Sequence, residues 1–303
     1  MVGTTDVFCD KTHFSEPTQE EIDFIIEEIK PYFGKDYDYK ANLLSSWAGL
    51  RPLVKSAEGD AAPDESHGVR AYLSGSMQAS VRWLAHKLQG KKKSSTAQIS
   101  RNHVIEVESD SGLVSLMGGK WTAFRVQGEQ TMDRILADHP EVARNVKYTS
   151  GQTLNFNLIG SYSKVETTDG VKQSNEALFQ SYEDHLVFDF DLQREVAKHL
   201  VKTYGTMSMK VASVGKDAGL NQRLSEDYPF LEAEVLYSIR NEMAQKPNDV
   251  VCRRVPVSFI DTATTCDVIL PKVVSIFGKE LKWSEARIKK ELSEAQEGLK
   301  SMK

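Results

Sequence analysis

Three cationic residues lie at the ends of short segments that are expected to form neighbouring strands. They are Arg51, just before Pro52, Arg101 at the start of an alternating segment, and Lys120 directly after two glycines. Guanidinium forks together with an ammonium group bind a dianionic phosphate ester well. A single arginine at a strand end is more often a surface ion pair, whereas three cations at neighbouring strand ends favour an anion site.

The residues around Lys120 read as a strand that breaks at two glycines and then enters a helix. The sequence from Leu116 to Arg125 is LMGGKWTAFR. A helix start leaves backbone N–H groups without partners and carries the positive end of the helix dipole. Gly118 and Gly119 let an acceptor approach the backbone, because no Cβ is in the way. Such a turn suits an anion or a ring that accumulates negative charge, although the pattern taken alone favours a plain structural turn.

Other catalytic and metal-binding patterns are missing from the sequence. It contains no HExxH, no GxxxxGK[ST] and no GxGxxG motif, and spacing singles out no Ser-His-Asp set. Cys9, Cys252 and Cys266 are odd in number and form no CxxC pair, so we expect free thiols and no metal site. His103 is the histidine nearest the cations, and a packed or solvent-facing role is favoured for it over proton transfer.

The composition is that of an ordinary globular protein of 303 residues, with 40% hydrophobic and 27% charged residues. A formal net charge of −5 gives no overall electrostatic reason to bind nucleic acid. The apolar runs are far shorter than the ~20 residues that a membrane-spanning helix needs. Residues 1–6 have the features of neither a secretory signal nor a transit peptide. These observations exclude several protein classes without naming a function.

The first half predicts a hairpin next to the glycine turn. Residues 101–107 and 113–117 alternate as two strands, and a helix follows Lys120 through about Ala137. The core candidates of this helix are Met132, Ile135 and Leu136.

A separate helix is expected near the N-terminus. Thr18 and Glu21 form a capping-box pattern, and isoleucines every three to four residues give this helix one buried face until Pro31 ends it. Residues 55–98 differ in composition from their surroundings, which predicts a surface insertion.

The second half predicts a helical domain. Residues 148–170 are polar and read as a linker with a short strand at 154–159. Beyond them Gly205 is expected to end one helix and Ser284 to cap another. The apolar positions expected to share buried faces are Leu192, Val196, Leu200 and Tyr204; Leu231, Val235, Leu236, Ile239 and Met243; and Val268, Ile269, Val273, Ile276 and Phe277, a series that Pro271 interrupts.

At these residues the chain resembles the C-terminal half of FAD-dependent glycerol-3-phosphate dehydrogenases, membrane-associated enzymes that pass electrons to quinone. The order and spacing fit over nearly the whole chain apart from residues 55–98, and the Trp121 form of the glycine-lysine motif is similar to the mitochondrial version. The segments that carry the resemblance are 3–6, 46–53, 100–104, 118–125, 232–235, 253–254 and 281–283.

The resemblance implies an α+β fold. Residues 1–147, with the insertion 55–98, would form the C-terminal portion of an amino-acid-oxidase-like FAD/substrate domain, 148–170 a linker, and 171–303 an all-α C-terminal cap domain. The family oxidises sn-glycerol 3-phosphate at C2 to dihydroxyacetone phosphate, with electrons passing through FAD to ubiquinone. The resemblance also implies peripheral association with the mitochondrial inner membrane, and it leaves a homodimer open.

By position, the resemblance implies that Arg51 and Lys120 bind the substrate, with Arg101 close by. It also implies that the backbone of the turn faces the flavin, at Gly118, Gly119, Lys120, Trp121 and Thr122. The family's Rossmann half, with its Gly-rich turn for the FAD pyrophosphate and the main candidates for catalytic residues, is expected in the same or a second chain, so catalytic residues are not assigned. We therefore expect this chain alone to hold FAD weakly or not at all.

Two other hypotheses stay open. One is a non-catalytic binding or assembly subunit that retains the cap domain, for which the three cations need not converge. The other is an oxygen-using glycerol-phosphate oxidase of the same family, which the yield of peroxide would separate from a quinone-linked enzyme.

Overall fold

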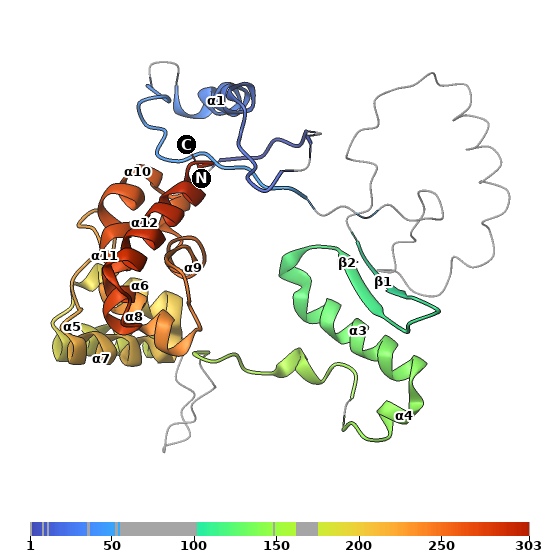
Figure 1. Ribbon diagram of the computed structural model, residues 1–303. Coiled ribbons are helices and arrows are strands. Elements are labelled where there is room, and N and C mark those ends of the chain that lie inside the picture. The colour runs from blue at the N-terminus through green and yellow to red at the C-terminus, as the bar shows by residue number, and fades with distance from the viewer. Residues whose placement is uncertain are drawn as a thin grey trace. The chain divides into compact units, whose positions relative to one another are not determined.

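Helices dominate this chain, and a single two-stranded sheet accompanies them in the part that the structure describes. The computed structural model describes residues 2–7, 9–10, 12–34, 37–51, 54, 102–147, 149–161 and 175–302 (Figure 1). The predicted insertion 55–98, Arg101 and most of the second half of the linker lie outside these residues. A mostly helical fold with a small sheet agrees with the predicted class at this coarse level.

The chain divides into two compact units. The helical unit consists of Met1–Thr5, Lys11–Gly49 and Asn157–Lys303, and the hairpin unit of Asp6–Asp10 and Leu50–Phe156. Residues 11–49 thus group with the helical unit, whereas the sequence analysis assigned them to the first domain. The boundaries 1–147, 148–170 and 171–303 stay a prediction.

The helical unit begins with α1 (Gln19–Phe33) and continues with the helices of the second half. These are α5 (Asn175–Phe190), α6 (Arg194–Tyr204), α7 (Ser208–Ala218), α8 (Glu232–Asn241), α9 (Pro247–Arg253), α10 (Thr262–Thr264), a π-helix (Thr265–Ile269), α11 (Leu270–Glu280) and α12 (Glu285–Leu299), with 3-10 helices at Gly205–Met207 and Val257–Phe259. None of the described helices is long and apolar enough to cross a bilayer.

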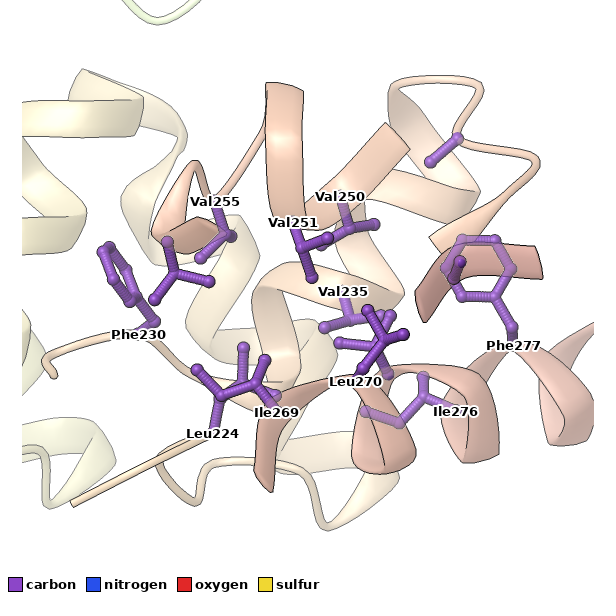
Figure 2. Packing of buried hydrophobic residues seen from close by; sticks show 14 of the residues in the cluster. Leu224, Phe230, Val235, Val250, Val251, Val255, Ile269, Leu270, Ile276 and Phe277 are labelled. Carbon is purple, nitrogen blue, oxygen red and sulfur yellow. The ribbon is translucent and has the colours of Figure 1, made fainter. Parts of the chain in front are cut away.

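Two apolar cores hold the helices of this unit together. In the first, side chains from α8, α9, α11 and α12 surround residues such as Val235, Val250 and Phe277, and Figure 2 shows those from α8, α9 and α11 gathered at one place. In the second, α5, α6, α7 and α8 pack around Leu186 and Leu200. Among described residues, every buried apolar side chain lies between Leu186 and Leu299, so this unit contains the apolar cores that the structure shows.

Helix ends agree with most of the predicted signals. The Thr18–Glu21 capping box is present at α1, the Ser284 hydroxyl accepts from the Arg287 amide, and Gly205 ends α6 at φ 56°. Pro31, however, does not end α1, which runs on to Phe33. A proline there removes one hydrogen bond in the last turn only, and the Gly34 amide still bonds Lys30 O at 2.9 Å.

Three predicted details of the helical unit are wrong. The isoleucine face of α1 contains no fully buried residue. Met243 is 85% exposed, because α8 already ends at Asn241. Val268 is exposed because the π-helix shifts the helical register: the Leu270 amide bonds Thr265 O, and the next residue is a proline without an N–H.

The hairpin unit contains the predicted hairpin. Strands β1 (His103–Val107) and β2 (Val114–Gly118) pair antiparallel with His103 opposite Gly118. After β2 come a 3-10 helix (Trp121–Ala123), α3 (Phe124–Asp138), α4 (Pro140–Ala143) and a second 3-10 helix (Gln152–Asn155).

Two expectations for the hairpin unit are corrected. Met132, a core candidate, is exposed, and Ile135 and Leu136 are only half-buried. The strand at 154–159 is not formed, because Gly151 takes a left-handed conformation at φ 78° and starts a 3-10 turn, in which the Leu154 amide bonds the Gly151 carbonyl at 3.0 Å.

Candidate functional site

The turn after β2 depends on two glycines in left-handed conformations. Gly118 has φ 70° and Gly119 has φ 81°, values that residues with a Cβ rarely adopt. A Cβ on Gly119 would also lie 2.3 Å from Gln127 Nε2 and 2.8 Å from the Cβ of His103. Close packing within the chain therefore requires glycine at position 119 whatever ligand the turn binds.

Gln127 holds this turn onto α3. It is the one buried residue of α3, and its side-chain amide donates to the carbonyl of Lys120 at 3.2 Å. The same carbonyl accepts from the Ala123 amide at 2.9 Å. Our sequence reasoning missed Gln127, although its place one turn into a helix that follows two glycines was a usable signal.

Several backbone amides of this turn have no acceptor among the described residues. Among the described residues, the backbone amides of Gly119, Lys120, Trp121 and Thr122 have no backbone hydrogen bond outside the helices and strands. Lys120 is the N-terminal flanking residue of the 3-10 helix and supplies no side-chain cap. The side chains from Lys120 to Thr122 are exposed, with Trp121 at 87%. A row of free amides beside an ammonium group and a flat aromatic ring suits a planar, electron-accepting ligand.

His103 has a structural place next to the turn. Its backbone lies opposite Gly118, and its Nε2 lies 2.6 Å from Gln130 Oε1 on α3. This geometry fits the packed or solvent-facing role that the sequence favoured.

Arg51 is held by a carboxylate from the start of the chain. Its Nε lies 3.5 Å from Asp6 Oδ2, and the two side chains are 41% and 30% exposed. A guanidinium has five N–H donors, so one that pairs with an aspartate through Nε can also bind a second oxyanion through its terminal nitrogens. No sequence signal pointed to Asp6 as the partner of Arg51. Because Arg101 lies outside the described residues, the convergence of the three cations stays a prediction.

In the helical unit, by contrast, Glu234 of the 232–235 segment has a purely structural setting. Its carboxylate is fully buried and accepts from the Leu231 amide at 2.8 Å and from the Tyr204 hydroxyl at 2.9 Å, while His199 Nε2 lies 2.9 Å away. Burial and the neighbouring Glu234 charge raise the pKa of Tyr204 well above its usual range. Glu234 therefore ties α6 to the start of α8.

Residues of the other two helical segments also hold helices together. Arg254 Nε lies 3.2 Å from Glu242 Oε2 and Arg254 Nη2 donates to Glu242 O at 2.9 Å. Trp283 stacks on Phe277 with ring centroids 5.5 Å apart. The described residues bring together no group of three or more potential metal ligands, and Cys9, Cys252 and Cys266 are free thiols.

Comparisons with known proteins agree with the resemblance. Residues 151–288 match the family described as the C-terminal domain of alpha-glycerophosphate oxidase. The whole chain is 31% identical to a Dictyostelium discoideum protein named probable mitochondrial glycerol-3-phosphate dehydrogenase, of which it covers 40%. It is also 32% identical, over 97% of its length, to the mitochondrial glycerol-3-phosphate dehydrogenase of Mus musculus, of which it covers 34%. The chain is a relative of the glycerol-3-phosphate dehydrogenases.

A solved structure also matches the fold of this chain. The glycerol-3-phosphate dehydrogenase from Bacillus halodurans complexed with FAD matches this structure with a TM-score of 0.50 and 22% identity, over 65% of this chain and 37% of that one. At this identity the likeness concerns the fold alone. The chain spans 34–40% of the length of the two dehydrogenases compared above.

Proposed function

We propose that this chain supplies the substrate-binding and cap regions of an FAD-dependent oxidoreductase that oxidises sn-glycerol 3-phosphate to dihydroxyacetone phosphate. The observation that carries the proposal is the turn from Gly118 to Thr122, with its free amides next to Lys120. Relatedness to glycerol-3-phosphate dehydrogenases along the whole chain supports the same substrate and cofactor.

The turn fits the electron-rich edge of a flavin. FAD, when bound, would accept the hydride from C2 of the substrate and release the electrons to an acceptor. Amides of Gly119, Lys120, Trp121 and Thr122 at the start of a helix would stabilise negative charge on the pyrimidine edge of the reduced ring. Gly118 and Gly119 would let the ring approach the backbone closely.

The phosphate of the substrate would be bound by cations. Lys120 supplies an ammonium group within the turn, and Arg51, whose Nε lies 3.5 Å from Asp6 Oδ2, supplies a guanidinium group. Arg101 is proposed as the third member. Charge-assisted bonds of this kind are about twice as strong as neutral ones and fix the orientation of the substrate.

Catalytic groups and the pyrophosphate site are assigned to a Rossmann-type FAD half, in the same chain or a second one. Ubiquinone is the proposed acceptor, and peripheral association with the mitochondrial inner membrane is the proposed location. The word mitochondrial in the names of the relatives supports the organelle. Dimerisation is left as a proposal without a described interface.

An oxygen-using glycerol-phosphate oxidase is the second candidate. The match of residues 151–288 to the C-terminal domain of alpha-glycerophosphate oxidase favours it specifically. The two candidates differ in the acceptor alone, so the ratio of quinone reduced to peroxide formed per substrate oxidised separates them.

Flavin retention tests the proposal. The purified chain is mixed with FAD, freed of excess cofactor and examined by absorbance, alone and with the FAD-binding half of a related dehydrogenase supplied; that half without this chain is the control. We expect retained flavin to rise sharply when both parts are present. Equal retention by the control and the mixture would contradict a role of this chain in flavin binding, and would favour a non-catalytic binding subunit.

A further inference from the structure

We propose that Gln127 is a positioning residue: it holds the carbonyl of Lys120 toward α3, and it thereby aims the N–H of Trp121 at the flavin and raises the reduction potential of the bound ring. The inference rests on the proposed binding of flavin by the turn from Gly118 to Thr122. It goes beyond that proposal, because it assigns one amide of the turn to the ring and names the residue that orients this amide.

Gln127 is the one buried residue among the described residues of the hairpin unit, and it is polar. A buried amide group requires hydrogen-bond partners. The side-chain nitrogen of Gln127 has such a partner in the Lys120 carbonyl, at 3.2 Å. Because α3 packs against β2, this bond joins the helix to the turn that follows the strand (Figure 1). The buried position thus supports the turn rather than an apolar core.

Two donors hold the Lys120 carbonyl in one direction. One is Gln127 Nε2, and the other is the Ala123 amide, which donates to the same oxygen at 2.9 Å. The C=O of Lys120 and the N–H of Trp121 belong to one planar peptide group. In a trans peptide, as here, these two bonds point in opposite directions. Holding the carbonyl toward α3 therefore directs the Trp121 N–H away from α3.

The side of the turn that faces α3 is closed to a ligand. A Cβ on Gly119 would lie 2.3 Å from Gln127 Nε2 and 2.8 Å from the Cβ of His103, so atoms of the chain already fill this side. Trp121 and Thr122, by contrast, are exposed. Among the described residues the Trp121 amide has no backbone acceptor. The Trp121 N–H therefore faces the open side of the turn, where a ring can approach.

A donor held in this direction stabilises the reduced flavin more than the oxidised flavin. Reduction places negative charge on the pyrimidine edge of the ring, and a hydrogen bond to a charged acceptor is about twice as strong as a neutral one. A donor that is already oriented needs no rearrangement when the charge develops. A peptide group that is free to tilt loses part of this effect. Gln127 should therefore raise the reduction potential of the flavin.

The midpoint potential of the flavin tests the proposal in the holoenzyme, formed from this chain and the FAD-binding half of a related dehydrogenase. Gln127→Met removes the donor and keeps a long, flexible side chain that fits buried positions. We expect reduced flavin to bind about 10-fold less tightly relative to oxidised flavin, which lowers the potential of a two-electron couple by about 30 mV. Gln127→Leu gives the same test if the methionine variant does not fold.

Gln130→Met is the matched control. Gln130 lies about one turn further along α3, and its Oε1 is 2.6 Å from His103 Nε2 in β1, so it joins the same helix to the hairpin without touching the turn. The control should leave the potential unchanged. A role of α3 in stability alone would give Gln127→Met and Gln130→Met the same potential as the parent protein, whatever their melting temperatures.

A second pair of variants tests the amide itself and leaves Gln127 in place. Trp121→Pro removes the N–H. Proline fits there, because Trp121 is the first residue of the 3-10 helix and Lys120 before it is extended, at φ −93° and ψ 127°. Trp121→Ala is the reference, since it also lacks the indole but keeps the N–H. We expect the proline variant to have the lower potential by about 30 mV. Adding Gln127→Met to Trp121→Pro should cause little further change, because both substitutions remove the same contact.

The outcomes separate the levels of the argument. If the parent protein retains no flavin with both halves present, the proposed function is wrong, and this inference with it. If flavin is retained but Trp121→Pro and Trp121→Ala have equal potentials, the assignment of this amide to the ring is overturned and the proposed function stands. If Trp121→Pro has the lower potential but Gln127→Met has the potential of the parent, or shifts the proline variant as much as it shifts the parent, the positioning role of Gln127 is overturned.

Discussion

Gly119 and Gln127 are packed so closely that a Cβ on the glycine would come within 2.3 Å of the glutamine Nε2. The same amide nitrogen donates to the Lys120 carbonyl at 3.2 Å. The sequence suggests that Gly119 lets a ligand approach the backbone. Packing within the chain also requires a glycine at this position. The two roles are compatible, because the contact with Gln127 fixes the turn whose amides stay free.

Gly119→Ala should therefore destabilise the turn and weaken flavin retention together. A left-handed φ of 81° and the clash with Gln127 should cost about 1–3 kcal/mol. Gly128→Ala is the control in the following helix, where a Cβ meets nothing within 4 Å and alanine should be neutral or stabilising. Thermal unfolding and the FAD dissociation constant are the measurements. Equal behaviour of the two variants would show that the turn is not a constrained element.

Lys120→Ala should impair use of the substrate without unfolding the protein. We expect a higher KM for glycerol 3-phosphate and a loss in kcat/KM equivalent to about 2–4 kcal/mol, because a charge-assisted contact with the substrate is lost. Lys147→Ala removes an exposed lysine of the same unit and serves as the control. Steady-state kinetics of the holoenzyme give both numbers, and unchanged kinetics for Lys120→Ala would remove it from the site.

Glu234→Ala should affect stability rather than catalysis. The substitution leaves His199, the Tyr204 hydroxyl and the Leu231 amide without their common partner, which should lower the free energy of unfolding by about 3–5 kcal/mol. Tyr204→Phe, which removes one bond, should cost about 1 kcal/mol. Denaturant unfolding checks both values against Glu297→Ala, an exposed carboxylate for which the change should stay within about 0.5 kcal/mol. A Glu234→Ala variant as stable as Glu297→Ala would refute the structural assignment.

Tyr228 should make stability fall at alkaline pH. Partial burial and the hydrogen bond to Asp261 raise the pKa of Tyr228 to about 12. A raised folded-state pKa contributes stability that is fully present below the unfolded value near 10 and is lost as the pH rises through about 12. As the pH rises from about 10 to about 12, Tyr228→Phe should therefore lose less stability than the parent protein. Tyr32 is exposed, so Tyr32→Phe should behave like the parent. Identical alkaline profiles for Tyr228→Phe and the parent would contradict the shift.

Local signals were sufficient for the hairpin, for the Thr18–Glu21 capping box and for the caps at Gly205 and Ser284. Each of these depends on residues a few positions apart, and the sequence displays such spacing directly. The strand expected at 154–159 shows the limit of that reasoning, because its alternation was genuine but the left-handed Gly151 started a turn first.

The site required contacts that no local pattern carries. Asp6 and Arg51 lie 45 positions apart in the sequence, and Gln127 acts on a carbonyl seven residues before it. Periodicity identified Met132 as a core residue because it marks a face, yet it cannot say whether anything covers that face. Sequence reasoning pointed to this turn as a candidate site, which stays a prediction, and the contacts that support the turn were found only in the structure.

Anaerobic reduction of the flavin tests the central claim most directly. Glycerol 3-phosphate is added to the FAD-loaded holoenzyme without an acceptor, in the parent protein and in the Arg51→Ala and Lys120→Ala variants. The account predicts rapid bleaching of the flavin absorbance in the parent and a requirement for much higher substrate concentration in both variants. A parent protein that holds FAD yet is not bleached by glycerol 3-phosphate would contradict the account.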